Sequence, residues 1–509
     1  MDWPQLPATE AAAVSSAAPA AGAGKMTAEP GGGRIDIFAA ANFQRTACRF
    51  PVKPGQVVEC ADLNVPENSG QPGGRTIRLH VARFQAGENP QPDPVIYLHG
   101  GPGGGALANI AAMYAYGFRH LFPDRDFIAY DQRGVGFSVP RLACPELALA
   151  YALSLAQDER ASLLGWEAAH SQACLAKLAG TGANLAAYST AASAADLEAL
   201  IQALGYGQVN LFGQSYGTHL ALAYLNEYGS RGRVRSVLLD GVYPLQADTL
   251  VARGRHAWAA WQAVFAACAA DAGCQRAYPD LEQRFLRLLE RLAQQPITLQ
   301  VSNPLTGSDQ PVVLNDFRLI EAVYRSSYVS GWIPKFPALI AELEQGDGAL
   351  AREALENVFL TGASTDQGAY YAVTCNDGAG LVSAEAIRAA NAALPEAVRA
   401  YFDELGLGVL AACQALAGES APLARRQAAV SDVPALLLSG AFDPITPPAL
   451  AKLAAETLSR GYVSLFPAES HDLLGSNLCA QLVAYQFLQD PVMPVDECLD
   501  ALPGPQWGP

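Results

Sequence analysis

Residues 208–217 read Gln-Val-Asn-Leu-Phe-Gly-Gln-Ser-Tyr-Gly, and an apolar-periodic stretch, 218–228, follows directly. The first part is a short apolar run typical of a buried strand, and the second has the spacing of a helix. Between them, Gly213 to Gly217 matches G-x-S-x-G, in which a sharp strand-to-helix turn lifts a serine hydroxyl above the edge of a sheet. A chain with 46 glycines can contain this pentapeptide by chance, so an ordinary serine in a tight turn is the alternative. The strand and helix on either side favour Ser215 as a nucleophile.

Similar runs lie on both sides of this turn. Residues 94–105 and 126–138 each form a short apolar run that ends in a glycine-rich turn, and residues 234–244 form another strand pattern. A helix is predicted over 191–204, with Ser193 as a plausible N-cap. Strands that alternate with helices predict an α/β protein with a mostly parallel sheet flanked by helices.

The alternation stops at residue 246 and resumes near 431. We therefore predict a sheet domain formed by 34–245 and 431–509, with a mostly helical cap over 246–430. Such an insertion would lie over the carboxyl ends of the strands, where open α/β sheets bind ligands. Some of the cap's aromatic residues should line a pocket there, and the candidates are Trp258, Trp261, Phe265, Tyr324, Tyr328 and Trp332.

Composition and charge exclude several classes of protein. Half of the residues are hydrophobic and 16% are charged, which is a core-forming composition. The formal net charge is −16, and a surface this acidic repels phosphate backbones, so a nucleic-acid partner is not expected. No segment has the length and apolarity of a membrane span. Residues 1–33 are rich in Ala, Pro and Gly and predict a flexible leader that is not an intact signal peptide. The oligomeric state is left open, with a monomer favoured.

The ten cysteines carry information about the compartment. No C-x-x-C occurs and no histidine lies at zinc-finger spacing, so no metal site is expected. Ten free thiols in a reducing compartment are one interpretation. The other is five disulfides between sequence neighbours in a secreted or periplasmic protein, which we favour. The pairs would be Cys48–Cys60, Cys144–Cys174, Cys268–Cys274, Cys375–Cys413 and Cys479–Cys498.

A serine nucleophile needs a base, and the chain has seven histidines. In hydrolases with this turn the base follows the serine in the chain. His219 lies on the predicted helix of the nucleophile itself, and His256 begins the cap. His471 follows the last predicted strand in a loop that opens a helix, which is the expected place for the base. We therefore predict His471 as the base of Ser215.

The acid that orients the base should also follow a strand. Asp443 comes directly after the apolar run 435–442, and Asp240 ends the strand before the cap. We predict Asp443 and keep Asp240 as the alternative.

The loop 99–106 admits two interpretations. In the first, backbone amides of Gly101 and Tyr216 form an oxyanion hole, with Gly100 as the alternative to Gly101. In the second, residues 101–106 are the glycine fingerprint of a dinucleotide-binding oxidoreductase, with Asp131 as its acidic partner. Pro102 lacks an amide that a phosphate would use, so the second interpretation is remote.

Five motifs together resemble one family. They are HGGPGG at 99–104, DQRGVGFS at 131–138, GQSYGT at 213–218, GAFDPITP at 440–447 and SHDLLG at 470–475. In this order they resemble the proline iminopeptidase and tripeptidyl aminopeptidase group of α/β-hydrolases. Three further stretches are typical of its exported tripeptidyl-aminopeptidase-like branch, namely CADLNVPENSG at 60–70, CAADAGC at 268–274 and VTCND at 373–377. The resemblance extends from about residue 45 onward. It implies the α/β-hydrolase fold and a triad of Ser215, Asp443 and His471, with DQRGVGFS as a structural turn.

The resemblance also implies a reaction. It indicates an exported serine aminopeptidase that releases residues or short peptides from peptide N-termini through an acyl-enzyme, without metal or cofactor. Family members bind the substrate ammonium with cap carboxylates, for which Glu321 and Asp377 are candidates, although both could be ordinary solvated acidic residues. A carboxylesterase or lactonase acting on small apolar esters is the alternative function, and a catalytically inactive binding protein is a remote one.

Overall fold

The computed structural model describes residues 36–507 apart from 69, 72, 88, 89, 158, 159, 305, 364, 415, 417–426, 493 and 495. The predicted leader, residues 1–33, lies outside the described residues. Within the described part of the chain, no helix is long and apolar enough to cross a membrane.

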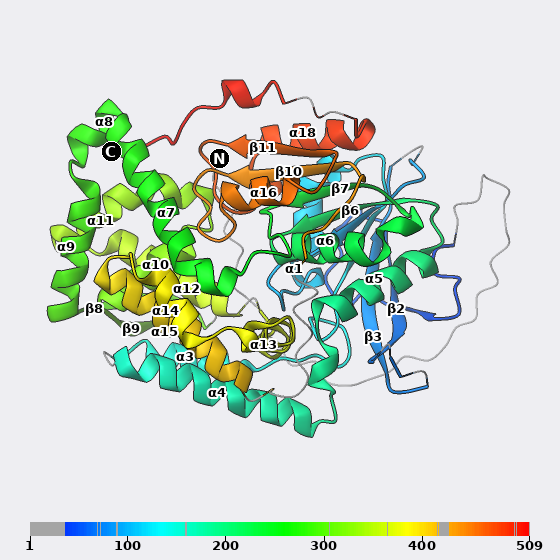
Figure 1. The fold of residues 1–509 in the computed structure, drawn as a ribbon, viewed down its shortest axis with the longest axis horizontal. Coiled ribbons are helices and arrows are strands. Elements are labelled where there is room, and N and C mark those ends of the chain that lie inside the picture. The colour runs from blue at the N-terminus through cyan, green and yellow to red at the C-terminus, as the bar shows by residue number, and fades with distance from the viewer. Residues whose placement is uncertain are drawn as a thin grey trace.

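A nine-stranded sheet forms the centre of the molecule (Figure 1). The first four strands in its spatial order, listed below, pair antiparallel with one another. From the fourth strand to the ninth, every neighbouring pair is parallel. This confirms the predicted α/β class and mostly parallel sheet. In spatial order the strands are β1 (Phe43–Thr46), β2 (Val58–Pro66), β3 (Thr76–Phe84), β5 (Phe127–Tyr130), β4 (Val95–Leu98), β6 (Val209–Gln214), β7 (Val234–Asp240), β10 (Ala435–Gly440) and β11 (Gly461–Phe466).

Helices cover both faces of this sheet. Every residue of β4, β5 and β6 is buried, as expected of strands between two helical layers. One face packs against α5 (Thr190–Leu204), α6 (Tyr216–Tyr228) and α16 (Pro448–Ala455). The other packs against α1 (Leu107–Met113) and α18 (Leu478–Gln489).

The predicted cap of helix α5 is wrong. Ser189, and not Ser193, is the N-cap, and its hydroxyl accepts a hydrogen bond from the amide of Ala192. Ser193 is buried inside the helix. The helix therefore begins one residue earlier than its apolar periodicity indicated, and the polar residue just before the first turn satisfies a free amide.

Between β7 and β10 the chain forms a layer of helices with a core of its own, which includes Trp258, Trp261 and Phe265 (Figure 1). It also contains an antiparallel hairpin of β8 (Ile297–Asn303) and β9 (Ser308–Leu314). Its helices are α7 (Thr249–Ala270), α8 (Ala272–Ala277), α9 (Leu281–Gln294), α10 (Asp316–Ser326), α11 (Phe336–Glu344), α12 (Ala349–Ala363), α13 (Gln367–Asn376), α14 (Ala384–Asn391) and α15 (Glu396–Gln414).

Two helices from the first part of the chain join this layer. They are α3 (Pro145–Ser154) and α4 (Arg160–Gly180), and α4 lies along α15 at the bottom of Figure 1. The side-chain amide of Gln172, on α4, donates a hydrogen bond to the backbone carbonyl of Ala411, on α15, at 2.8 Å. The boundaries 34–245, 246–430 and 431–509 stay predictions, and this packing argues for including 145–180 with the cap.

All ten cysteines lie in the five predicted pairs. The Cα–Cα distances run from 5.1 Å in Cys268–Cys274 and Cys375–Cys413 to 6.0 Å in Cys144–Cys174. These distances are normal for disulfides. The pairing of sequence neighbours is thus confirmed, and ten free thiols are not the state of this fold.

Candidate active site

Ser215 lies at the sharp turn between β6 and α6, with φ 55° and ψ −122°. A non-glycine residue in this region of φ and ψ is strained, and such strain is typical of functional turns. The glycines on either side are steric requirements. A Cβ at Gly217 would lie 1.8 Å from the carbonyl oxygen of Leu98, and one at Gly213 would lie 2.5 Å from the carbonyl oxygen of Gly217. The local sequence therefore folds as the strand–turn–helix elbow that the motif predicts.

Asp443 and His471 meet in the loops that follow β10 and β11. Oδ2 of Asp443 lies 2.7 Å from Nδ1 of His471. Thr446 donates its hydroxyl to Oδ2 at 2.6 Å, and the amides of Ile445 and Thr446 donate to Oδ1 at 2.8 and 2.9 Å. Asp443 is fully buried and His471 is 8% exposed. The carboxylate is thus fixed on one side of the imidazole, which leaves Nε2 for a substrate or nucleophile.

The two groups stabilise each other's charged forms. Burial opposes ionisation of Asp443, but His471 and the Thr446 hydrogen bonds outweigh it and hold the pKa of Asp443 below its ordinary value. Burial likewise opposes the charge on His471, but the carboxylates of Asp443, Asp240 and Asp472 together outweigh it and raise the pKa of His471 above its ordinary value of 6.5. An imidazolium formed during a reaction would therefore be stabilised where it forms.

Asp240, the alternative acid, has a different position. Its carboxylate accepts hydrogen bonds from the amides of Leu473 and Leu474 at 3.1 and 2.9 Å. Burial, together with the nearby Asp472, raises its pKa. Asp240 therefore anchors the chain that follows His471, while Asp443 contacts the imidazole itself.

The glycine loop after β4 packs directly on Ser215. A Cβ at Gly100 would lie 2.9 Å from Cβ of Ser215, so only glycine allows this approach. Gly101 and Tyr216 line the same cavity as Ser215 and His471. Their roles as oxyanion-hole donors remain predictions that this arrangement permits.

The DQRGVGFS stretch forms a braced turn beneath that loop. The carboxylate of Asp131 accepts from the amides of Leu107 and Phe137 at 3.0 and 2.7 Å. Arg133 binds both carboxylate oxygens of Asp196 at 2.7 Å. Asp131 is therefore engaged in holding the loop, which removes it as the ribose ligand of a dinucleotide site.

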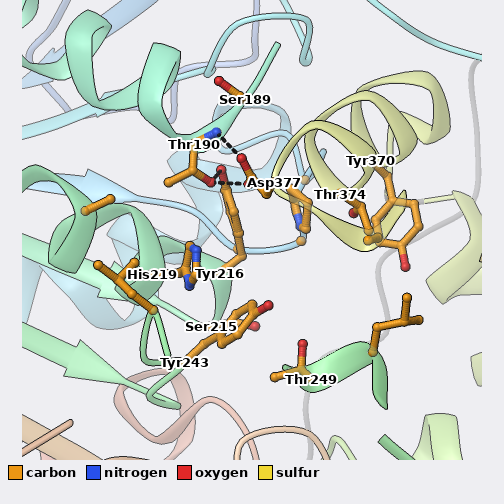
Figure 2. A pocket seen from close by; sticks show the side chains of 18 of the residues that line it. Ser189, Thr190, Ser215, Tyr216, His219, Tyr243, Thr249, Tyr370, Thr374 and Asp377 are labelled. Atoms are coloured by element: carbon orange, nitrogen blue, oxygen red, sulfur yellow. Dashed lines mark hydrogen bonds between the residues drawn. The ribbon is translucent and has the colours of Figure 1, made fainter. Parts of the chain in front are cut away.

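A cavity of about 1320 Å³ contains Ser215 and His471 and is lined by both the sheet domain and the cap. Figure 2 shows Ser215, Tyr216 and Tyr243 on one side of it, with Tyr370 and Thr374 of α13 on the other. Of the cap aromatics proposed from the sequence, the cavity is lined by Tyr324 and Tyr328. The others belong to the cap core, namely Trp258, Trp261, Phe265 and Trp332.

The two predicted ammonium ligands have different surroundings. Asp377 lines the cavity, and its carboxylate accepts from the amide and hydroxyl of Thr190 at 2.9 and 2.5 Å (Figure 2). Glu321 is not among the lining residues, and Arg318 donates to its carboxylate at 2.8 Å. Their assignment as substrate ligands stays a prediction, and only Asp377 is placed to meet a substrate.

Sequence reasoning missed two residues of the cavity wall, Arg253 and Arg325. Neither belongs to a motif, and each lies within an ordinary helical pattern, α7 and α10 respectively. Only the fold shows that they face the nucleophile's cavity.

The raised pKa of His471 predicts the pH dependence of activity. The base must be neutral to accept a proton, so kcat/KM should fall as the pH drops through the His471 pKa, with a midpoint above 6.5. Replacing Asp443 by Asn should move that midpoint to lower pH, because the negative charge that stabilises the imidazolium is removed. Steady-state kinetics from pH 5 to 9 on both proteins measure this, and an unchanged midpoint in the variant would contradict the pairing.

Comparison with known proteins agrees with this geometry. Residues 93–319 match the family described as alpha/beta hydrolase fold, and residues 399–498 match the family described as TAP-like protein. Serine protease Hip1 of Mycobacterium tuberculosis is 30% identical over 230 residues, 42% of this chain and 42% of that protein. The tripeptidyl aminopeptidase of Streptomyces lividans is 27% identical over 351 residues, 63% of this chain and 60% of that protein.

A further relative is the proline iminopeptidase of Xylella fastidiosa, 25% identical over 232 residues, 45% of this chain and 53% of that protein. The chain thus spans from 42% to 60% of the length of these three relatives. The matches cover the strands that carry Ser215 and the region that carries Asp443 and His471. The chain therefore has the α/β-hydrolase fold and is similar to the tripeptidyl aminopeptidases and proline iminopeptidases.

Proposed function

We propose that this protein is an exported serine aminopeptidase that releases residues or short peptides from the N-termini of small peptides. The observation that carries the proposal is the Asp443–His471 hydrogen bond of 2.7 Å, in the same cavity as the strained Ser215. The names of the matched relatives favour peptide substrates. The five disulfides favour export, because such bonds persist in oxidising compartments.

In the proposed reaction, His471 removes the proton of Ser215 as its oxygen attacks the scissile carbonyl. The oxyanion of the tetrahedral intermediate is stabilised by the backbone amides of Gly101 and Tyr216. His471 then gives the proton to the leaving amine, which breaks the amide bond and leaves an acyl-enzyme on Ser215. Water, deprotonated by the same base, hydrolyses this ester, and Asp443 keeps the imidazole oriented throughout.

A panel of anilides tests the peptidase assignment. Free and N-acetylated aminoacyl and tripeptidyl p-nitroanilides should be compared with p-nitrophenyl esters. An aminopeptidase should lose most of its kcat/KM on N-acetylation, because the substrate ammonium is lost. Equal rates on free and acetylated anilides, with much faster ester hydrolysis, would instead identify a carboxylesterase or lactonase.

The cap predicts the size of the substrate. The cavity wall includes residues of α7, α10 and α13, so the nucleophile lies beneath the cap and not on an open surface. We expect short peptides to be cleaved from their N-termini and intact casein to be left nearly untouched. Reversed-phase chromatography with mass spectrometry follows both reactions, and internal cleavage of casein at rates near those for a tripeptide anilide would refute the exopeptidase assignment.

A further inference from the structure

Two arginines on the cavity wall, Arg253 and Arg325, lack a direct ion pair in the part of the chain that the structure describes. Among the described residues, Arg253 and Arg325 make no ion pair with a carboxylate. Arg253 donates to the hydroxyl of Tyr370 at 3.4 Å, a long hydrogen bond. Arg325 lies over the ring of Tyr324, with its guanidinium carbon 5.8 Å from the ring centre. Both side chains are only partly exposed, so solvent satisfies them incompletely.

Other enclosed arginines of this chain are paired. Arg83 binds Asp126 at 2.7 Å, Arg133 binds Asp196 at 2.7 Å, and Arg125 binds Asp93 at 3.1 Å. The chain has 49 acidic residues against 33 basic ones, so carboxylates are abundant. Arg253 and Arg325 differ from these arginines because, among the described residues, neither forms a direct ion pair with a carboxylate, and both line the cavity that contains Ser215.

The nearest carboxylate along α10 is already engaged. Glu321 lies four residues before Arg325, a spacing that favours an ion pair on a helix. Its carboxylate instead contacts Arg318 at 2.8 Å. Glu321 therefore forms its direct ion pair with Arg318, and its effect on Arg325 is limited to a longer-range electrostatic interaction.

The carboxylates on the cavity wall also have other contacts. Asp248 accepts from the amide of Val251 at the start of α7, and Asp377 accepts from Thr190. Glu67 accepts from the amide of Asn184, and Asp472 from that of Gly475. A further lining residue, Glu227, is exposed to solvent. Among the described residues, no carboxylate thus lies within ion-pair distance of either guanidinium group, and Glu321 acts on Arg325 only from a greater distance.

The position of the two cations relates them to the reaction. Tyr324 and Tyr328 are close enough to both guanidinium groups to interact with them electrostatically. The ring of Tyr328 packs edge-on against His471, with the ring centres 5.5 Å apart. The two cations therefore line the same cavity as Ser215 and share a wall with Tyr328, the side chain that packs against His471.

We propose that Arg253 and Arg325 form an anion-binding subsite that selects substrates carrying a carboxylate. The carboxylate would be either an acidic side chain or the C-terminal carboxylate of a short peptide. Guanidinium groups suit this ligand because they stay charged at all working pH values and match the geometry of a carboxylate. The proposal rests on the serine hydrolase function proposed above and narrows its substrate class.

Two matched substrate series test the subsite. The first compares short peptides with a free C-terminal carboxylate and with a C-terminal amide. The second compares Glu and Gln at each position of peptides that are C-terminally amidated. In the wild type, the carboxylate should raise kcat/KM about 10- to 100-fold in one series, as expected for charge-assisted hydrogen bonds. The series that responds identifies the source of the carboxylate.

In the variants Arg253→Gln and Arg325→Gln, the ratio of kcat/KM for the charged substrate to that for the neutral one should fall toward one. In the double variant this ratio should equal one. Arg255→Gln is the matched control, because Arg255 lies on the same helix but is exposed and does not line the cavity. It should keep the full preference. Hydrolysis of p-nitrophenyl butyrate, which carries no charge, should change less than about threefold in Arg255→Gln.

The outcomes distinguish failure of the anion-binding subsite from failure of the proposed serine hydrolase function. Equal rates for charged and neutral members of both series in the wild type would overturn the subsite, even if the ester is hydrolysed normally. Absence of ester and peptide hydrolysis would overturn the proposed function. In that case, calorimetry of the same peptides with Ser215→Ala still tests the subsite. Tighter binding of the carboxylate-bearing peptides, lost when Arg253→Gln or Arg325→Gln is added, supports the subsite. Equal binding of charged and neutral peptides refutes it.

Discussion

Replacing Ser215 by Ala is expected to lower kcat by about 10⁴-fold or more on any substrate that the wild type cleaves. The reason is chemical, since alanine has no hydroxyl to attack the carbonyl and no acyl-enzyme can form. Ser215 also adopts a strained backbone conformation, with φ 55°, and such strain is typical of functional turns. Rates should be normalised to the total protein concentration, which is measured independently of activity. The preparation should also be checked for contaminating wild-type enzyme.

The protein should fold normally after this change. The elbow is fixed by the close approach of Gly213 and Gly217 to their neighbours, and alanine at position 215 disturbs neither contact. Thermal unfolding within a few degrees of the wild type is therefore the expected control. Residual activity within tenfold of the wild type, in a pure and folded variant, would remove Ser215 as the nucleophile.

The second large effect is expected from Asp443→Asn, with a loss in kcat of about 10⁴-fold. Asn is nearly isosteric, so the hydrogen bonds from Ile445 and Thr446 can persist. However, its amide can donate to Nδ1 of His471 and hold the tautomer in which Nε2 carries the proton. That tautomer cannot accept the serine proton, so the loss should appear in kcat.

Asp240→Asn is the matched control for this substitution. Asp240 is equally buried and close to the same loop, but it contacts the amides of Leu473 and Leu474 and not the imidazole. Asp240→Asn should lower the thermal stability of the protein, because it weakens the contacts with Leu473 and Leu474. Its effect on kcat should be much smaller than that of Asp443→Asn. A larger loss of kcat for Asp240→Asn would mean that Asp240 is the acid of the reaction.

Much of the fold follows from local patterns. The strands around Ser215 are short, apolar and fully buried, so their sequences have few alternatives. The cysteines were predictable because each has a partner near it in the sequence. The hairpin β8–β9 and the packing of α3 and α4 on the cap were not predicted, since both depend on contacts between segments whose own sequences indicate nothing about their neighbours.

Part of the candidate site could likewise be predicted from local sequence patterns, and part could not. Ser215, Asp443 and His471 follow strands, so their positions in the chain already place them at one edge of the sheet. The hydrogen bonds then distinguish Asp443 from Asp240, which the sequence alone could only rank. Arg253 and Arg325 could not be found in this way, because a helical arginine facing a cavity has the same sequence pattern as one facing solvent.

The central claim, that Ser215 is a nucleophile activated by His471, is tested most directly by fluorophosphonate labelling with peptide mapping. In the wild type, mass spectrometry should find one phosphonylated residue, Ser215, and the labelling rate should rise with pH through the His471 pKa, above 6.5. In His471→Ala the same site should react at least about 100-fold more slowly. No labelling of the folded protein, or a label on another serine, would contradict the account.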